Sequence, residues 1–135
     1  MVNEFLSLIK SKLGCGYVLG SQGEIMTKER LEQLIKWAGG DRSKYYFNGY
    51  SAEMWIGKQC FDCSGLIVWT LQQLGLLKPS QDFTAHTMYY NLCIPINRNE
   101  LKPGDLCFVQ GEKNITHVGV YMGNDKVIHA RGTKY

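Results

Sequence analysis

Cysteine and histidine side chains supply nucleophilic and basic groups near neutral pH, and this chain has five of the former and three of the latter. Apolar residues and a threonine recur three, four, seven, eight and eleven positions after Cys63. This spacing predicts a helix that carries Cys63 on its first turn. Unpaired backbone N–H groups and the positive end of the helix dipole favour thiolate there. Although an arbitrary cysteine is more often a small core residue, we therefore interpret Cys63 as a candidate nucleophile.

A nucleophilic thiol needs a base, and the histidines are the candidates. His117 begins one short strand-like run and His129 lies near the end of the next. In cysteine hydrolases an imidazole takes the thiol proton, and a third polar group fixes the ring. Cys63, His117 and His129 are the candidate set. His86 lies in a weak helical pattern and is interpreted as a surface or structural residue.

The two histidines allow a geometric test of this set. Facing residues on antiparallel strands share one side of the sheet, and a one-residue slip moves a side chain to the other side. A regular turn at Asn124-Asp125 would place His117 and His129 on opposite faces. The catalytic hypothesis therefore predicts an odd-length connection or a bulge near Gly123.

Two alternatives use Cys60, which forms a C-x-x-C with Cys63. One is a thioredoxin-like redox pair, but the motif lacks the βαβ context that such pairs have. The other is a zinc module with His117 and His129, but no second close pair of ligands has finger-like spacing. We therefore expect neither a metal nor another cofactor. The remaining cysteines are expected to be reduced and structural.

Helical periodicity comes first along the chain and strand-like runs come last. Helices are expected at 2–13, 28–38, 63–74 and 82–91, and strands at 105–110, 117–122 and 126–130. The segments 14–23 and 41–57 are interpreted as irregular loops. This order predicts an α+β domain, with helices packed on one face of a small antiparallel sheet.

Composition sets the class of protein. At 135 residues and 44% hydrophobic content, one domain spanning 1–135 can form an ordinary core without metal or disulfide support. The net charge of +3 is too mild and dispersed for a nucleic-acid surface. No apolar run reaches the length of a membrane span. The N-terminal residues have the wrong order of charge for a secretory signal, so synthesis in the cytoplasm is expected.

Four blocks resemble, in order, the motifs of the NlpC/P60 cysteine peptidases: FDCSGL at 61–66, LKPGDL at 101–106, HVGVYMG at 117–123 and VIHA at 127–130. The resemblance implies a papain-like α+β core and a hydrolase of peptidoglycan stem peptides. Its bond is commonly that between D-glutamate and the following diamino acid. A non-catalytic wall-binding or structural domain of the same fold is the alternative.

The resemblance also implies residue roles. Cys63 would be the nucleophile, His117 the general base and His129 the residue that orients it. Tyr17 would lie near the thiol and help to hold the oxyanion, together with the backbone N–H of Cys63. Asp62 and Ser64 would bind the amino end of the stem peptide, although capping the helix is an adequate structural reason for either.

The chain also departs from the family pattern. Gly16 stands where proline is usual, and Ser21 stands where a second glycine is usual. The stretch at 24–58 is interpreted as an insertion that walls the substrate cleft. Few residues follow His129, so a module of a longer parent chain with a wall-binding module is one expectation. A phage endolysin or an autolysin acting at the bacterial cell wall fits these features.

Overall fold

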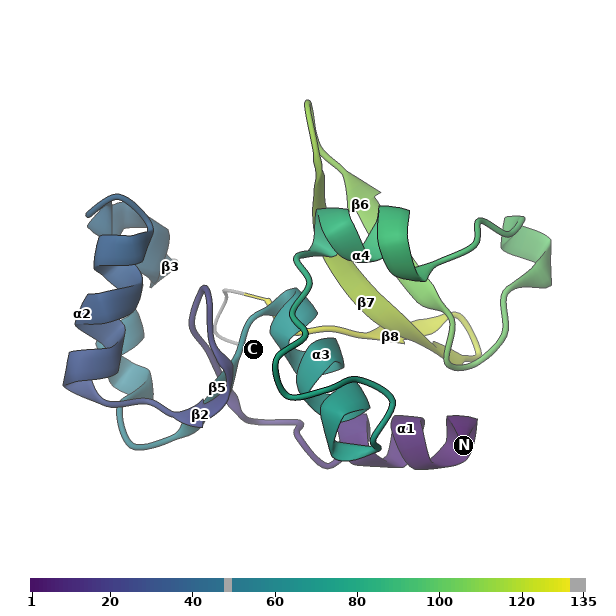
Figure 1. The fold of residues 1–135 in the computed structure, drawn as a ribbon, viewed down its shortest axis with the longest axis horizontal. Helices are drawn as coiled ribbons and strands as arrows, with labels where there is room; N and C mark the ends of the chain where they lie inside the picture. Colours follow the sequence, from purple (N-terminus) through teal and green to yellow (C-terminus); the bar gives the residue numbers. More distant parts are fainter. Residues whose placement is uncertain (48–49, 132–135) are drawn as a thin grey trace.

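The computed structural model describes residues 1–47 and 50–131, and it has mixed α+β architecture. The four α-helices are α1 (Val2–Lys10), α2 (Lys28–Trp37), α3 (Cys63–Gln73) and α4 (Ala85–Leu92). Three 3₁₀ helices are η1 (Arg42–Tyr45), η2 (Ala52–Trp55) and η3 (Arg98–Glu100). Figure 1 shows α2 at one end of the molecule, α3 near its centre and the largest sheet at the other end. The predicted fold class is confirmed.

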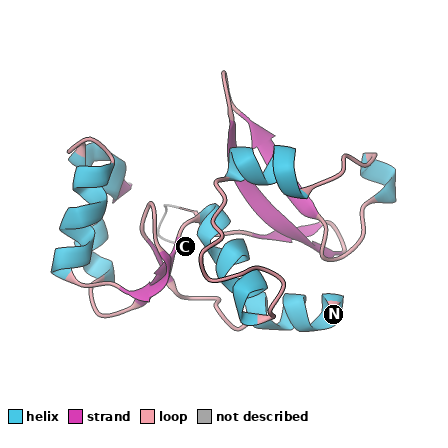
Figure 2. Ribbon diagram, viewed as in Figure 1, coloured by secondary structure: helices cyan, strands magenta, loops and turns pink. Residues whose placement is uncertain are grey.

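The C-terminal sheet carries both candidate histidine strands. It is antiparallel, in the order β6 (Leu106–Gln110), β7 (Ile115–Gly123) and β8 (Lys126–Ile128). Figure 2 shows α4 beside this sheet and α3 beneath it. Val118 and Val120 of β7 are buried with apolar residues of α1, α3 and α4. Because these two positions share one face of β7, that face forms the main core.

A second, smaller sheet lies before α3. It has the order β1 (Gly16–Tyr17), β5 (Gln59–Phe61) and β2 (Gln22–Ile25), with β1 parallel to β5. The interpretation of 14–23 as an irregular loop is therefore wrong for β1 and the start of β2. These strands are too short for a periodic pattern, and their pairing depends on residues far away in the sequence.

The segment 24–58 surrounds a core of its own. Val18, which follows β1, and Cys60 of β5 also belong to this core. The buried residues of the segment itself are Met26, Leu31, Leu34, Ile35, Tyr45 and Ala52. Within this segment β3 (Tyr46–Phe47) pairs with β4 (Tyr50–Ser51), so the interpretation of 41–57 as a loop missed a short hairpin and two 3₁₀ helices. The positions between these two strands lie outside the described residues.

Close packing around position 16 explains why the residue there is glycine. A Cβ atom there would lie 2.7 Å from Cys60 Sγ and 2.8 Å from Trp55 Cδ2. Both distances are shorter than real Cβ contacts, so the packing of Trp55 and Cys60 requires glycine. The proline of the family pattern would not fit beside these side chains.

Polar caps fix two of the predicted helix starts. The Thr27 side chain accepts a hydrogen bond from the Arg30 amide at 3.0 Å, and Asp62 Oδ1 accepts one from the Gly65 amide at 2.6 Å. These caps confirm the starts of α2 and α3. The helix expected to reach Leu13 ends instead at Lys10, and the Leu13 side chain is 70% exposed.

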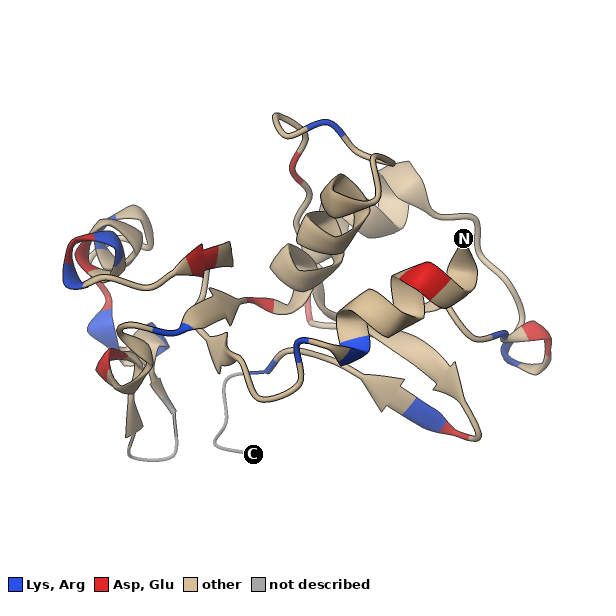
Figure 3. Cartoon of the chain, turned by 90° about the horizontal axis from the view of Figure 1, so that it is seen from below, with Lys and Arg blue, Asp and Glu red and all other residues tan. Residues whose placement is uncertain are grey.

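Figure 3 shows that charged residues of both signs are distributed along the chain and do not gather on one element. Helix α3 and strand β7 contain no Lys, Arg, Asp or Glu. The two elements that carry Cys63 and His117 therefore meet in an apolar setting. None of the described helices combines the length and apolar character needed to cross a bilayer.

Candidate active site

The β7–β8 hairpin contains an irregularity close to its turn. Tyr121 pairs with Val127, but Gly123 pairs with Lys126, so Met122 is an extra residue on β7. The predicted bulge near Gly123 is confirmed. It shifts every later pair by one residue, which decides the face on which His129 lies.

The bulge brings the two histidines together. His117 Nε2 lies 2.8 Å from His129 Nδ1, and the rings meet edge to face with their centroids 5.0 Å apart. The turn itself consists of Asn124 and Asp125, whose φ angles of 53° and 59° give it the twist of a tight hairpin. Since the Nε2 atom of His117 is hydrogen-bonded to His129, the Nδ1 atom of His117 is the ring nitrogen available to the Cys63 thiol.

Cys63 is the first residue of α3, and its side chain is half-buried. Burial raises the pKa of the Cys63 thiol, and the nearby Asp62 carboxyl raises it further. The nearby backbone groups of Val118, Ser64 and Cys63 itself act in the opposite direction and lower the pKa of the thiol. The contact with Val118 places the sulfur against β7, one residue from His117.

Both histidines favour the neutral imidazole. Burial lowers the pKa of His117 below its usual value, and His129 and Arg131 lower it further. Burial and Arg131 also lower the pKa of His129. The raised pKa of the Cys63 thiol and the lowered pKa of His117 both favour a neutral thiol beside a neutral imidazole.

This pairing predicts the pH dependence of thiol alkylation. The rate at which iodoacetamide modifies Cys63 is expected to rise continuously between about pH 6 and pH 9, because thiolate forms only as the pH approaches the raised pKa. Peptide mapping by mass spectrometry separates Cys63 from the other cysteines. A rate that levels off below pH 7 in the native protein, but not in His117→Ala, would instead indicate a preformed thiolate–imidazolium pair.

Asp62 links the start of α3 to the loop between β1 and β2. Besides the cap to Gly65, its Oδ2 accepts a hydrogen bond from the Gly20 amide at 2.9 Å. The Ser64 hydroxyl donates to Asp62 Oδ1 at 3.4 Å, and Ser64 is only 8% exposed. Both side chains thus hold the backbone around Cys63. Their binding of a substrate amine stays a prediction.

Tyr17 lies near the thiol because of strand pairing. It is opposite Phe61 in the parallel β1–β5 pair, and β5 leads directly into α3. Burial raises the pKa of Tyr17, and the proximity of Cys63 and then Asp62 raises it further. The hydroxyl therefore stays protonated and can donate a hydrogen bond. Its role in holding an oxyanion stays a prediction.

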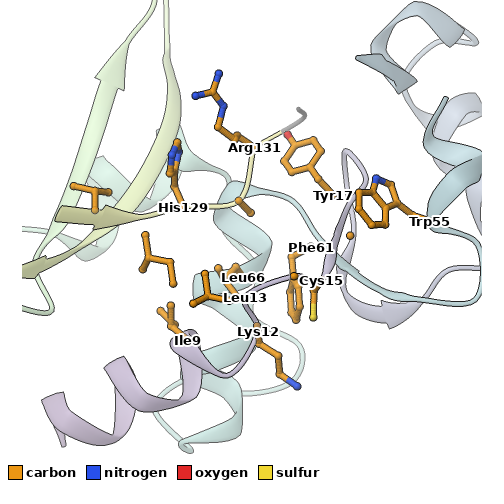
Figure 4. Close-up of a pocket in the computed structure, with 15 residues that line it drawn as sticks. Ile9, Lys12, Leu13, Cys15, Tyr17, Trp55, Phe61, Leu66, His129 and Arg131 are labelled. Carbon is orange, nitrogen blue, oxygen red and sulfur yellow. The ribbon is translucent and has the colours of Figure 1, made fainter. Parts of the chain in front are cut away.

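A pocket of about 430 Å³ opens beside His129. Tyr17, His129 and Arg131 lie at one end of it, and Trp55 of η2 lies next to Tyr17 (Figure 4). Neither Cys63 nor His117 lines this pocket. Sequence reasoning missed Arg131 and Trp55. The position of Arg131 two residues after His129 was the available signal, whereas nothing local marked Trp55.

Cys60 does not face the site. It is fully buried, its sulfur lies 3.4 Å from the Lys58 carbonyl oxygen, and burial raises its pKa to about 12. It belongs to the core of segment 24–58, whereas Cys63 packs against the main core. All five cysteines are free. Within 1–47 and 50–131, no three His, Cys, Asp or Glu side chains could together hold a metal ion, which gives the zinc alternative no support.

His86 has a structural contact, as predicted. Its Nδ1 accepts a hydrogen bond from the Ile115 amide at 3.1 Å, which ties α4 to the start of β7.

One protein-family model matches the part of the chain that contains these site residues. The model described as "NlpC/P60 family" matches residues 37–135, which is most of the chain and includes Cys63, His117 and His129. The chain belongs to the NlpC/P60 family. Tyr17 precedes the matched region, so the match says nothing about it.

Curated relatives match a little more than half of the chain. The Escherichia coli protein "Murein DD-endopeptidase MepH" is 43% identical over 76 residues, covering 54% of this chain and 27% of the relative. "Probable endopeptidase p60" of Listeria seeligeri is 36% identical over 81 residues, covering 58% and 15%. "Bifunctional muramidase/DL-endopeptidase CwlT" of Bacillus subtilis is 36% identical over 73 residues, covering 52% and 21%. The aligned part is therefore about a quarter or less of each relative's length.

A solved structure supports the NlpC/P60 fold. NlpC1 from Trichomonas vaginalis superposes with a TM-score of 0.64 and 24% identity, covering 96% of this chain and 35% of that chain. At this identity the likeness concerns the fold alone.

Proposed function

We propose that this domain is a peptidoglycan hydrolase that cleaves stem peptides with Cys63 as nucleophile. The observation that carries the proposal is the 2.8 Å contact between His117 Nε2 and His129 Nδ1, which occurs only because Met122 bulges out of β7. The sulfur of Cys63 lies against the same strand. A base oriented by a second polar ring beside a helix-start thiol is the arrangement that nucleophilic catalysis requires.

The first chemical step transfers one proton. His117 accepts the Cys63 thiol proton at its Nδ1 as the sulfur attacks the scissile carbonyl carbon. Throughout this step the Nε2–H of His117 stays in place and donates a hydrogen bond to His129 Nδ1. The lowered pKa of His129 keeps that ring neutral, so its Nδ1 can accept a hydrogen bond from the imidazolium that forms. The pairing therefore stabilises positive charge on His117 as it develops.

The later steps return that proton. The backbone N–H of Cys63 and the Tyr17 hydroxyl donate to the oxyanion of the tetrahedral intermediate. When the intermediate collapses, the C–N bond breaks and His117 protonates the leaving amine, which gives a thioester on Cys63. A water molecule, deprotonated by His117, then hydrolyses the thioester to a carboxylic acid and free thiol.

Segment 24–58 contributes a wall of the substrate cleft in this proposal. Trp55 lines the pocket beside Tyr17, and the Tyr45 hydroxyl donates to the Leu34 carbonyl at 2.9 Å, close to the Leu19 carbonyl at 3.2 Å. These contacts connect α2 and η1 to the loop that follows Tyr17. The segment thus supports both the pocket and the backbone around Tyr17.

The proposed bond is that between D-glutamate and the following diamino acid. The name DL-endopeptidase of the Bacillus subtilis relative fits such a bond, whereas the name DD-endopeptidase of the Escherichia coli relative favours a bond between two D-centres. Digestion of purified peptidoglycan with the protein distinguishes them. New amino groups on the diamino acid are the expected product, and new ends from a D,D bond would replace this assignment. If no stem-peptide fragments are released, the proposed function is wrong.

His129→Ala is expected to lower kcat about 10- to 100-fold with little change in KM, because His117 keeps its basic nitrogen but loses the acceptor that orients it. His129→Asn, which retains an acceptor oxygen, should recover part of this loss. Steady-state kinetics on a stem peptide measures both. His86→Gln is the matched control, since it changes a histidine outside the site. An unaltered kcat in His129→Ala would remove His129 from the mechanism.

A further inference from the structure

Asp62 lies at the junction of two parts of the molecule that have separate cores. Helix α3, which begins directly after it, packs in the main core, whereas Val18 is fully buried in the core of segment 24–58. The Asp62 amide donates a hydrogen bond to the Ser21 carbonyl oxygen at 2.9 Å. Asp62 therefore joins the loop 18–21 to the start of α3.

The Asp62 carboxylate uses one oxygen for each side of this junction. Its Oδ1 accepts a hydrogen bond from the Gly65 amide at 2.6 Å in the first turn of α3, and its Oδ2 accepts one from the Gly20 amide at 2.9 Å in the loop. The loop and the helix also meet without a gap, because a Cβ atom at Gly65 would collide with the Ser21 carbonyl oxygen. The carboxylate thus bridges two backbone segments whose separation is fixed.

Cys63 follows Asp62 directly, so a shift of this junction would turn both the thiol and its backbone N–H. In the proposed reaction the thiol attacks the substrate and that N–H donates to the oxyanion, and both contacts require a fixed geometry. We propose that Asp62 is a positioning residue, whose bridge between helix and loop holds the Cys63 thiol and amide in their reactive orientation. This inference rests on the proposed function, because it gives Asp62 a part in thiol catalysis.

Two substitutions separate the bridge from the helix cap. Serine and asparagine at position 62 each offer a side-chain oxygen to the Gly65 amide, and both are good N-cap residues. Serine is too short to reach Gly20 as well, and asparagine has a single accepting oxygen in place of two. Asp62→Ser and Asp62→Asn are therefore expected to keep the fold but to lower kcat about ten-fold, with little change in KM.

Steady-state kinetics on a synthetic stem peptide measures kcat and KM, and thermal denaturation follows stability. Thr27→Ala is the matched control, because it removes a cap of the same kind, the hydrogen bond from the Arg30 amide at the start of α2. It should lower the midpoint of denaturation but leave kcat within about two-fold. Loss of a helix cap alone thus has its own signature.

The kinetic constants distinguish three roles for Asp62. A kcat that is unchanged in both variants would show that Asp62 only caps the helix, and a raised KM with an unchanged kcat would show that it binds substrate. Either result overturns the inference, while activity that depends on Cys63 leaves the proposed function standing. If the unmodified protein does not cleave the peptide, the proposed function fails and the inference fails with it.

Discussion

Cys63→Ala is expected to lower the rate of stem-peptide release by about 10⁴-fold or more, because no other group replaces the sulfur that forms the thioester. The alanine side chain fits the space that the thiol occupies at the start of α3, so the variant should fold normally. Release of soluble fragments from purified peptidoglycan, followed by mass spectrometry, measures the loss.

Cys93→Ala provides the comparison for this result. Cys93 is a half-buried cysteine at the end of α4, and its replacement should leave activity within about three-fold. If the protein with Cys63 and the Cys63→Ala variant release fragments equally, thiol chemistry is wrong. If neither releases any, the non-catalytic wall-binding alternative gains support.

His117→Ala is expected to lower kcat about 10³-fold at neutral pH, since the thiol then has no base. The lowered pKa of His117 sets the acid limb of the unmodified protein. Activity is gained as the pH rises through this pKa, so half-maximal activity should fall below pH 6.5, the usual value for histidine.

The pH profile of the His117→Ala variant provides the check. Its remaining activity should increase with pH toward the raised pKa of the Cys63 thiol, because hydroxide then forms the thiolate that His117 no longer provides. The variant and the unmodified protein should therefore approach each other as the pH rises. A variant that loses activity but keeps the original acid limb would show that another group is the base.

Local chemistry predicted the features of the site that depend on neighbouring residues. Thr27 and Asp62 each have a side-chain oxygen at a helix start, and both cap the helices expected after them. The face of the sheet on which His129 lies also follows from strand geometry. His129 and His117 share a face only if the β7–β8 connection has an odd length or contains a bulge. These inferences need nothing beyond period, capping and register.

The parts that sequence reasoning missed depend on distant contacts. Strand β1 has two residues, and it is a strand only because β5 pairs with it across more than forty positions. Trp55 belongs to a stretch without periodicity, and its place in the pocket follows from packing against Gly16. Arg131 is brought to the pocket beside His129 only when the β7–β8 hairpin has formed. Neither spacing nor composition contains this information.

The parallel pairing of β1 with β5 also bears on how the protein folds. Tyr17 and Cys63 can approach only after the chain between them has closed a long loop, which carries an entropic cost before any contact compensates for it. Segment 24–58 has a buried core that also includes Val18 before it and Cys60 after it. A compact segment shortens the effective loop and brings its ends together. We therefore expect this segment to form early, so that its collapse precedes and speeds assembly of the site.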